Sequence, residues 1–404
     1  MTLHTHTLAG CNLSPLLFAI FIDGLGRLLQ DTKIGISLKL LIIAILFFAD
    51  DMAVIAPTRK KLNRLINIVR DYFKTHRLKL SEQKSKILSH DAATGQLVIE
   101  GDMNNEDISL DQVISFKYLG VPFNSSPHSF FKSFNEQVKQ RALSYTYRVL
   151  SLVKSGPNRA ELAYTLWNQV ALPSILYGVE VFPINKGTID EIDRCQAIIG
   201  KFILQVPRST ANVASYLDAG LRPIWSVIAE KVLMYARSTM EKPSTYWPRV
   251  AMDEHINLGD ESSYSRYLLQ WKEKADCYGL NKENIRKALK KAAMKDVLSM
   301  IPRCKTTLFA MSTPGSSPRN PWFNLKPWVS DSGISKIFAE FRCCNAGLGN
   351  RGPANNGRRY KLCPLCLKNG RLALNNEVNY HYILKPFHCD PIRVRPNQIL
   401  IKFK

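Results

Sequence analysis

The stretch Phe48-Ala49-Asp50-Asp51 places two adjacent carboxylates between two apolar runs. Residues 40–47 form the run before it, and residues 52–56 form the run after it. Both runs are short, partly β-branched and free of glycine and proline, which is typical of two strands joined by a turn. We therefore predict a β-hairpin that carries Asp50 and Asp51 at its turn.

Carboxylates at the end of a buried strand lose hydration unless a cation meets them. Because Mg²⁺ prefers carboxylate, carbonyl and water oxygens, one interpretation of Asp50 and Asp51 is a site for a pair of divalent metal ions. The alternative is a solvated turn between two core strands, which is the commoner case in an arbitrary chain. The motifs on either side favour the metal site.

Three further motifs accompany the acidic pair in a fixed order. Gly10-Cys11-Asn12-Leu13-Ser14-Pro15 precedes it, and Leu80-Ser81-Glu82-Gln83-Lys84 and Phe116-Lys117-Tyr118-Leu119-Gly120 follow it. In this order and at this spacing, the four motifs resemble successive motifs of reverse transcriptases. The resemblance is greatest to those of non-LTR retrotransposons of the long interspersed element type, and it covers the first third of the chain most strongly.

The resemblance implies template-directed nucleotidyl transfer by two Mg²⁺ ions about 4 Å apart. It assigns catalytic roles to Asp50 and Asp51 as magnesium ligands and to Lys84 as the cation near the leaving pyrophosphate. The third carboxylate of the family's site lies on a strand well upstream of Gly10, and residues 1–9 contain no acid. We therefore expect an incomplete two-ion site and no fingers, so that this chain binds a template–primer without extending it.

The resemblance also assigns residues to nucleotide and nucleic-acid binding. Gly10, Ser14 and Pro15 would lie beside the templating base and the incoming nucleotide. Taken alone, this motif is as typical of an ordinary core helix that Ser14 caps and Pro15 begins. Tyr118 and Gly120 would belong to a small hairpin that grips the primer terminus, with Gly120 allowing the bend.

Periodicity predicts the elements around these motifs. Apolar residues recur at helical spacing over residues 62–76, with Thr58 as the N-cap. Residues 96–100 and 113–119 have the patterns of strands. A succession of strand, helix, strand and strand fits an α+β palm of the split βαβ type, truncated at its start.

The pattern becomes largely helical after residue 124. Pro173 and other prolines punctuate it. The predicted helices span residues 130–153, 158–171, 188–204, 209–219 and 224–240. The resemblance implies a helical thumb that follows the template–primer duplex through its backbone. We interpret its aromatic residues, including Trp167 and Tyr177, as core residues first and base-stacking residues second.

The pattern weakens from about residue 242, where helical patterns cover residues 263–277 and 282–300 and no chemistry is recognisable. The predicted division of the chain is therefore into four parts. These are a partial palm (1–124), a helical thumb (125–241), a helical linker region of unassigned function (242–345) and a zinc-knuckle-like segment (346–404).

The last part contains a candidate zinc site. Cys363 and Cys366 are separated by two residues, so one turn can bring both thiolates to a tetrahedral Zn²⁺, and His381 would supply a third ligand. Cys389 is our choice for the fourth ligand, with His388 as the alternative. Alone, the cysteine pair is also compatible with core cysteines or a redox motif. The same retroelement family often carries such a knuckle behind the thumb.

Composition agrees with a nucleic-acid partner. The chain has 404 residues and a formal net charge of +22, spread over several segments. This charge favours a polyanion, and the expected partners are an RNA template, a DNA primer and deoxynucleoside triphosphates rather than a membrane. The nine cysteines do not form a secreted disulfide framework, and the N-terminus has no signal segment. We expect a nuclear or cytoplasmic location.

Two hypotheses remain at this point. The chain is part of an RNA-directed DNA polymerase of a non-LTR retrotransposon whose upstream half was lost, or it is a catalytically dead nucleic-acid-binding protein derived from such an element. An upstream reading frame with a further Asp-bearing strand would favour the first hypothesis.

Overall fold

A computed structural model of the chain describes residues 14–300, apart from residues 39–40, 50, 91–93, 104, 155–158, 218 and 277–281. Its contacts divide the chain into two compact units. The first unit runs to Phe134 and adds Tyr235–Leu269, while the second covers Asn135–Met234 and continues from Gln270. Gly10, Asp50 and the predicted zinc ligands Cys363, Cys366, His381 and Cys389 lie outside the described residues.

The first unit combines short strands with helices. Its strands are β1 (Ile36–Leu38), β2 (Leu41–Ile43), β3 (Ile45–Phe48), β4 (Asp51–Val54), β5 (Lys86–Leu88), β6 (Gly95–Ile99), β7 (Ile108–Val113), β8 (Ser115–Tyr118) and β9 (Val121–Asn124). In the described part of the chain they pair as β1–β2, β3–β4, β5–β7–β6 and β8–β9. Only the β5–β7 pairing is parallel. The predicted mixture of helices and strands is confirmed.

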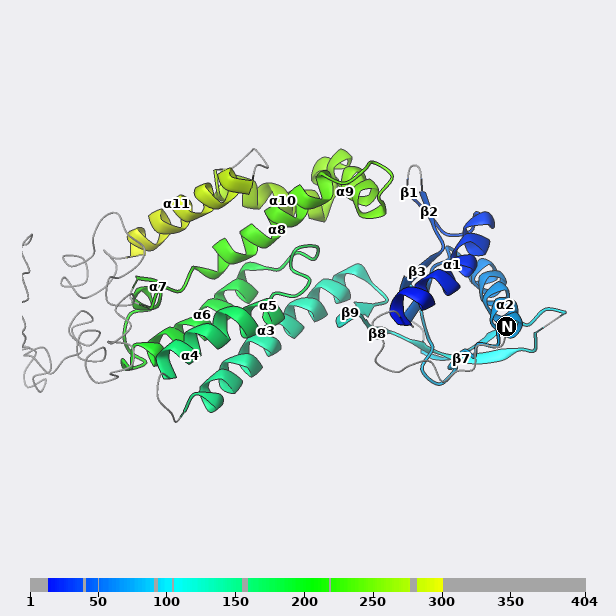
Figure 1. Ribbon diagram of the computed structural model, residues 1–404, viewed down its shortest axis with the longest axis horizontal. Helices are drawn as coiled ribbons and strands as arrows, with labels where there is room; N and C mark the ends of the chain where they lie inside the picture. Colours follow the sequence, from blue (N-terminus) through cyan, green and yellow to red (C-terminus); the bar gives the residue numbers. More distant parts are fainter. Residues whose placement is uncertain are drawn as a thin grey trace, which may run out of the picture. The chain divides into compact units, whose positions relative to one another are not determined.

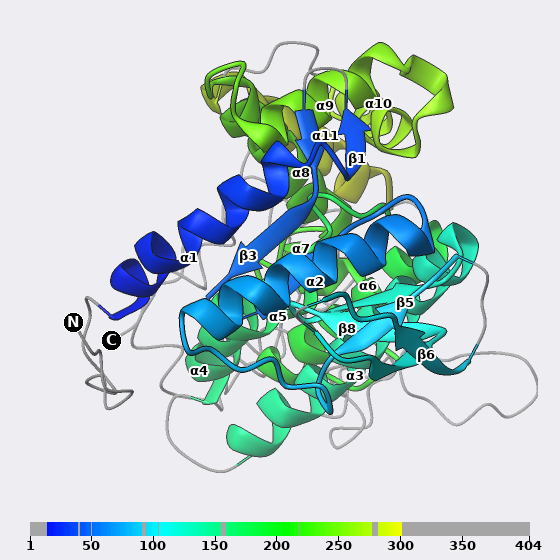
Figure 2. The same cartoon turned by 90° about the vertical axis from the view of Figure 1, so that its right-hand side faces the viewer.

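Two helices pack on the β3–β4 hairpin, namely α1 (Ser14–Asp31) and α2 (Arg59–Thr75). Figure 2 shows both of them beside β3. Their buried faces meet around Leu25, Ile45 and Leu65, and the Tyr72 hydroxyl of α2 donates a hydrogen bond of 2.8 Å to the Phe21 carbonyl of α1. One face of the β3–β4 hairpin is therefore held in place by a continuous apolar core shared with α1 and α2.

The prediction for α2 is confirmed. The helix begins at Arg59, and the Thr58 hydroxyl accepts a hydrogen bond from the Lys61 backbone N–H, as an N-cap does. Leu65 and Val69 are buried on the predicted apolar face, and the basic residues on the other side are mostly exposed.

The prediction of one strand over residues 40–47 is wrong, because the chain changes partner in the middle of the run. β2 pairs with β1, and β3 pairs with β4. Ala44 lies between the two ladders, and its carbonyl accepts a hydrogen bond of 2.8 Å from the Ile55 N–H. An uninterrupted apolar run gives no sequence signal for such a change of pairing partner.

Two further strand predictions need correction. The strand predicted over residues 113–119 is interrupted at Ile114, so that β7 ends at Val113 and β8 begins at Ser115. Most of β7 was not predicted, although Ile108 and Leu110 are buried and alternate with exposed residues. These strands belong to different sheets.

The rest of the described chain is helical, as predicted. The α-helices are α3 (Pro127–Leu152), α4 (Arg159–Leu166), α5 (Leu172–Ile175), α6 (Lys186–Ile203), α7 (Val213–Leu217), α8 (Ile224–Met240), α9 (Trp247–Asn257), α10 (Ser263–Lys274) and α11 (Lys282–Met300). A π-helical segment, η1 (Trp167–Ala171), joins α4 to α5, and a short 3₁₀ turn, η2 (Gly259–Glu261), precedes α10. Of these helices, α9 was not predicted and α7 is shorter than predicted.

Pro173 does not end a helix, contrary to the prediction. It lies in the first turn of α5, directly after the π-helical segment, and the Leu172 N–H donates to the Trp167 carbonyl five residues earlier. A proline has no N–H and cannot donate the i to i−4 hydrogen bond of an α-helix. Here Pro173 follows a wider π-helical turn, in which the i to i−4 pattern is already interrupted.

In the second unit, α6 contacts both α4 and α7, and α7 contacts α11. Figure 1 shows α4 and α6 side by side. Ile192, Ile199 and Trp167 are buried in this packing. No helix in the described ranges is both long and apolar enough to cross a membrane.

Candidate active site

The tip of the β3–β4 hairpin falls at the predicted acidic motif. Phe48 pairs with Asp51, so the loop between the strands consists of Ala49 and Asp50 alone. Ala49 has a φ of 52°, in the left-handed region that tight two-residue hairpin loops require. Asp51 is the first residue of β4, and its side chain is exposed. The predicted hairpin is confirmed, and the position of Asp50 lies outside the described residues.

The two faces of the hairpin differ in burial. Ile45 is buried in the core, and Phe47 and Met52 pack against the same core. Leu46 and Phe48 are exposed on the opposite face of β3. One face of the hairpin therefore packs on the core, and Asp51 at its end is exposed to solvent.

A second hairpin, β8–β9, carries Tyr118 and Gly120. Tyr118 pairs with Val121, so Leu119 and Gly120 form a two-residue loop. Both have positive φ, 48° for Leu119 and 80° for Gly120, as a type I′ turn requires. The hairpin expected over this motif is present, with Gly120 at its bend.

Asp51 and Tyr118 lie within electrostatic reach of each other. Burial raises the pKa of the Tyr118 hydroxyl, and the negative charge of Asp51 raises it further. Both residues belong to the first unit. Asp51 therefore acts electrostatically on Tyr118, although the two residues are 67 positions apart in the sequence.

Lys84 lies in a turn before β5 and is exposed. Its backbone N–H donates to the Ser81 carbonyl at 3.2 Å. Within the described ranges, its ammonium forms no ion pair with Asp51 or another acid. By contrast, Lys86 on β5 pairs with Asp111 on β7 at 2.5 Å. The structure therefore places Lys84 in an exposed turn.

The helix that follows the Gly10 motif is present. α1 is described from Ser14, and Pro15 lies in its first turn, as the motif predicts. This leaves Gly10 as the only one of the three predicted nucleotide-binding residues of this motif that lies outside the described residues.

The donor chemistry of the acidic tip suits Mg²⁺. The Asp51 carboxylate offers exposed oxygen ligands and makes no ion pair with a described residue. Among the described residues, no cluster of three or more histidine, cysteine, aspartate or glutamate side chains is close enough to hold a metal. Asp51 is thus the one member of the predicted magnesium pair whose surroundings the structure gives.

Of the two aromatic residues interpreted as core, Trp167 is buried and Tyr177 is not. Trp167 is fully buried, and its indole Nε1 donates to Gln196 Oε1 at 3.1 Å. Tyr177 is about half exposed, and the Arg141 guanidinium lies 5.9 Å from its ring centroid. Burial lowers the pKa of Arg141, opposed by Tyr145 and Tyr177. Trp167 is a core residue, and Tyr177 remains accessible to a ligand.

α11 carries none of the predicted site residues. Lysines recur there at every fourth position, at residues 287, 291 and 295, and this spacing is visible in the sequence. In the structure these lysines line a pocket with the C-terminal end of α10. The regular lysine spacing is therefore visible in the sequence, but it matches no recognisable functional motif.

Comparison with known proteins agrees with the motifs. Residues 4–123 match the family described as reverse transcriptase (RNA-dependent DNA polymerase). Two curated relatives, both from Popillia japonica, are named Retrovirus-related Pol polyprotein from type-1 retrotransposable element R2. They are 26% identical over 194 residues and 27% identical over 221 residues, which cover 46% and 52% of this chain.

This chain spans 30% of the length of each of these relatives. The match to the family and the two relatives together confirm the resemblance to non-LTR retrotransposon reverse transcriptases. The segment that matches the family contains the acidic hairpin and all but the last residue of the β8–β9 hairpin.

Proposed function

We propose that this chain is part of an RNA-directed DNA polymerase of a non-LTR retrotransposon and binds an RNA template paired with a DNA primer. The observation that carries the proposal is that the segment matching the family contains the acidic β3–β4 hairpin and most of the β8–β9 hairpin. The two hairpins carry two separate motifs of this segment. A solvated turn between core strands would not require the second motif to follow it.

The residues of the two hairpins and Lys84 would each have a separate role in nucleotidyl transfer. Asp50 and Asp51 would hold Mg²⁺, which, when bound, neutralises charge on the primer oxygen and the leaving pyrophosphate. The β8–β9 hairpin, with Tyr118 and Gly120, would position the primer end beside Asp51. The exposed Lys84 would reach the pyrophosphate as a compact cation.

The rest of the chain would support the nucleic acid. Residues 1–124 would supply the palm, with Gly10, Ser14 and Pro15 beside the templating base. Residues 125–241 would act as the thumb, 242–345 as a helical linker and 346–404 as a zinc-binding segment. The guanidinium of Arg141 beside the half-exposed Tyr177 supports a role for the second unit in backbone contact.

A second candidate function is nucleic-acid binding without catalysis. The formal net charge of +22 favours it, since binding to a polyanion through charge needs no metal site. The two candidates share the partner and differ in chemistry, so one set of experiments separates them.

Binding of an RNA–DNA template–primer by the full chain tests the proposal. We expect the logarithm of the association constant to fall linearly with the logarithm of the KCl concentration, by about 0.7–0.9 for each phosphate contacted. Fluorescence anisotropy of a labelled primer measures this. A chain that does not bind the template–primer at low salt would contradict both candidates.

Primer extension on the same template–primer, with Mg²⁺ and deoxynucleoside triphosphates, tests whether this chain retains catalysis. We expect residues 1–404 to bind without extending the primer. Extension that Asp50→Ala abolishes, and that the exposed control Asp31→Asn leaves intact, would show that polymerase activity is retained and would exclude the binding-only candidate.

A further inference from the structure

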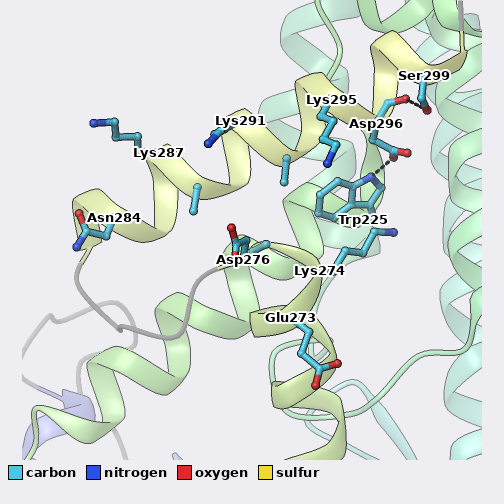
Figure 3. A pocket seen from close by; sticks show the side chains of 13 residues that line it. Trp225, Glu273, Lys274, Asp276, Asn284, Lys287, Lys291, Lys295, Asp296 and Ser299 are labelled. Atoms are coloured by element: carbon cyan, nitrogen blue, oxygen red, sulfur yellow. Dashed lines mark hydrogen bonds between the residues drawn. The ribbon is translucent and has the colours of Figure 1, made fainter.

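The second unit contains a pocket of about 760 Å³ between the C-terminal end of α10 and α11 (Figure 3). Trp225 of α8 forms part of its wall. The charged lining residues are Glu273, Lys274, Asp276, Lys287, Lys291, Lys295 and Asp296. The pocket belongs to none of the predicted sites.

Lysines form a row along the pocket side of α11. The buried side of α11 consists of apolar residues at every fourth position, namely Ile285, Leu289, Ala293 and Val297. Lys287, Lys291 and Lys295 follow each of the first three by two residues, so they lie on the other side of the helix, where they are exposed. At 1.5 Å per residue, the row of three Cα positions is about 12 Å long.

Trp225 in the wall of the pocket contacts two charged side chains. The Trp225 indole Nε1 donates to Asp296 Oδ2 at 2.7 Å, and the Lys274 ammonium lies 4.3 Å from the Trp225 ring centroid. Figure 3 shows Lys295 directed toward the same indole. Asp296 therefore already has a partner, and Trp225 holds Lys274 in place by a cation–π contact.

Four lysines and three acids share the lining, so the pocket keeps a net positive charge. Within the described ranges, Lys287, Lys291 and Lys295 form no ion pair with Glu273, Asp276 or any other acid. The row therefore presents three hydrated ammonium groups in a line, at the edge of a hollow large enough for a ligand to enter.

We propose that this row, with Lys274 beside it, binds successive phosphates of one nucleic-acid strand. Successive lysines of the row are about 6 Å apart along the helix axis, so each ammonium can meet a separate phosphate of the strand. Lysine ammoniums bind phosphate as point charges and read no base edge, so the contact is independent of sequence. The choice of nucleic acid as the polyanion rests on the proposed function.

The test compares two triple variants of the full chain. The row variant carries Lys287→Gln, Lys291→Gln and Lys295→Gln, since glutamine keeps helix propensity and removes the charge. The control variant carries Lys186→Gln, Lys242→Gln and Lys290→Gln, which removes the same charge from exposed lysines outside the pocket. A third variant with arginine at the three row positions keeps the charge. Circular dichroism melting curves check that all three fold.

The probe is a labelled single-stranded RNA, titrated at several KCl concentrations. We expect the row variant to bind about 10-fold more weakly near 0.1 M salt, with a salt slope shallower by about 2. The control and arginine variants should keep at least most of the affinity. Equal losses in the row and control variants, or no loss in the row variant, would overturn the inference.

Two further outcomes are informative. If the unmodified chain does not bind RNA at any salt concentration, the proposed function fails and the inference fails with it. If the unmodified chain binds RNA and the row variant loses binding only to vesicles of phosphatidylcholine and phosphatidylserine, the lysines serve a lipid headgroup, and the inference alone is overturned.

Discussion

Asp193 is a mostly buried carboxyl that joins three helices of the second unit. Its Oδ1 accepts hydrogen bonds from the Tyr216 hydroxyl at 3.1 Å and from the Ile224 N–H at 3.2 Å, the first residue of α8. Burial raises its pKa to about 6, while these two hydrogen bonds oppose the rise. Burial and the charge of Asp193 also raise the pKa of Tyr216.

Asp193→Asn should therefore change how stability depends on pH. Between pH 4 and 6 the folded chain binds this proton more tightly than the unfolded chain, so the free energy of unfolding falls as the pH rises through this window. The amide keeps the acceptor oxygen and removes the charge. We expect the variant to gain up to about 3 kcal/mol above pH 7 and almost nothing below pH 4.

Urea unfolding of both proteins from pH 4 to pH 8 measures this difference. Subtraction of the two curves removes the contribution of every other titrating group. Curves that stay parallel across the whole range would show that the Asp193 carboxyl is ionised equally easily in both states.

Gly120 is a second residue whose conformation has an energetic consequence. Its φ of 80° lies in the left-handed region, where an L-residue costs about 1–2 kcal/mol. Gly120→Ala should lower the free energy of unfolding by about 1 kcal/mol and weaken template–primer binding through a displaced Tyr118. The control is Gly187→Ala, where an added Cβ meets only Asn185 Oδ1 at 3.5 Å. Urea unfolding and anisotropy measure both effects, and equal results for the two variants would contradict the assignment of the turn.

At the scale of elements, Glu230 ties α8 to α11. Its Oε2 accepts from Arg222 Nη1 at 2.6 Å and its Oε1 from Arg286 Nε at 3.0 Å. Burial of Glu230 opposes its ionisation, but the hydrogen bonds and charges of the two arginines outweigh this and lower its pKa. The carboxylate thus stabilises the unit above the ordinary glutamate pKa, and this contribution is lost as the pH falls through the lowered value.

Glu230→Gln should loosen α11 more than it unfolds the chain. Since both arginines are more than half exposed, solvent screens the pairs, and we expect a loss of about 1 kcal/mol. Amide hydrogen exchange should quicken in Lys282–Met300. Glu241→Gln, which breaks the exposed Arg237–Glu241 pair, is the matched control. Equal exchange rates in α11 for both variants would contradict the role of Glu230.

The sequence predicted elements well where local signals agree. α2 was found because Thr58 caps it and its apolar residues follow one helical period, so no distant contact was needed. The split at Ala44 was missed because it depends on which strands pair across the sheet. The electrostatic effect of Asp51 on Tyr118 was likewise beyond sequence patterns, since it depends on how segments far apart in the chain fold.

At the scale of the whole molecule, charge and metal content are the testable properties. Residues 301–404 contain 17 lysines and arginines and 4 acids, so this segment carries 13 of the 22 net positive charges. Removing it should therefore weaken the salt-sensitive part of nucleic-acid binding more than removing an equal length of the first unit.

Residues 346–404 should bind one zinc ion per chain through Cys363, Cys366, His381 and Cys389. Metal analysis of the purified full chain measures the stoichiometry. Cys363→Ser should remove the zinc, and Cys195→Ser, at a buried cysteine of α6, should leave it in place. Comparison of Cys389→Ser with His388→Ala identifies the fourth ligand. A chain purified without stoichiometric zinc would refute the site.

The π-helical segment Trp167–Ala171 has a consequence for comparing this chain with its relatives. The wide turn holds one residue more than an α-helix would, so every side chain after it is rotated by about 100° relative to an uninterrupted helix. Ile175 and Leu176 follow the wide turn and are buried. A relative that lacks the wide turn would be one residue shorter here, and a single-residue gap placed within these five positions would be the structurally correct alignment.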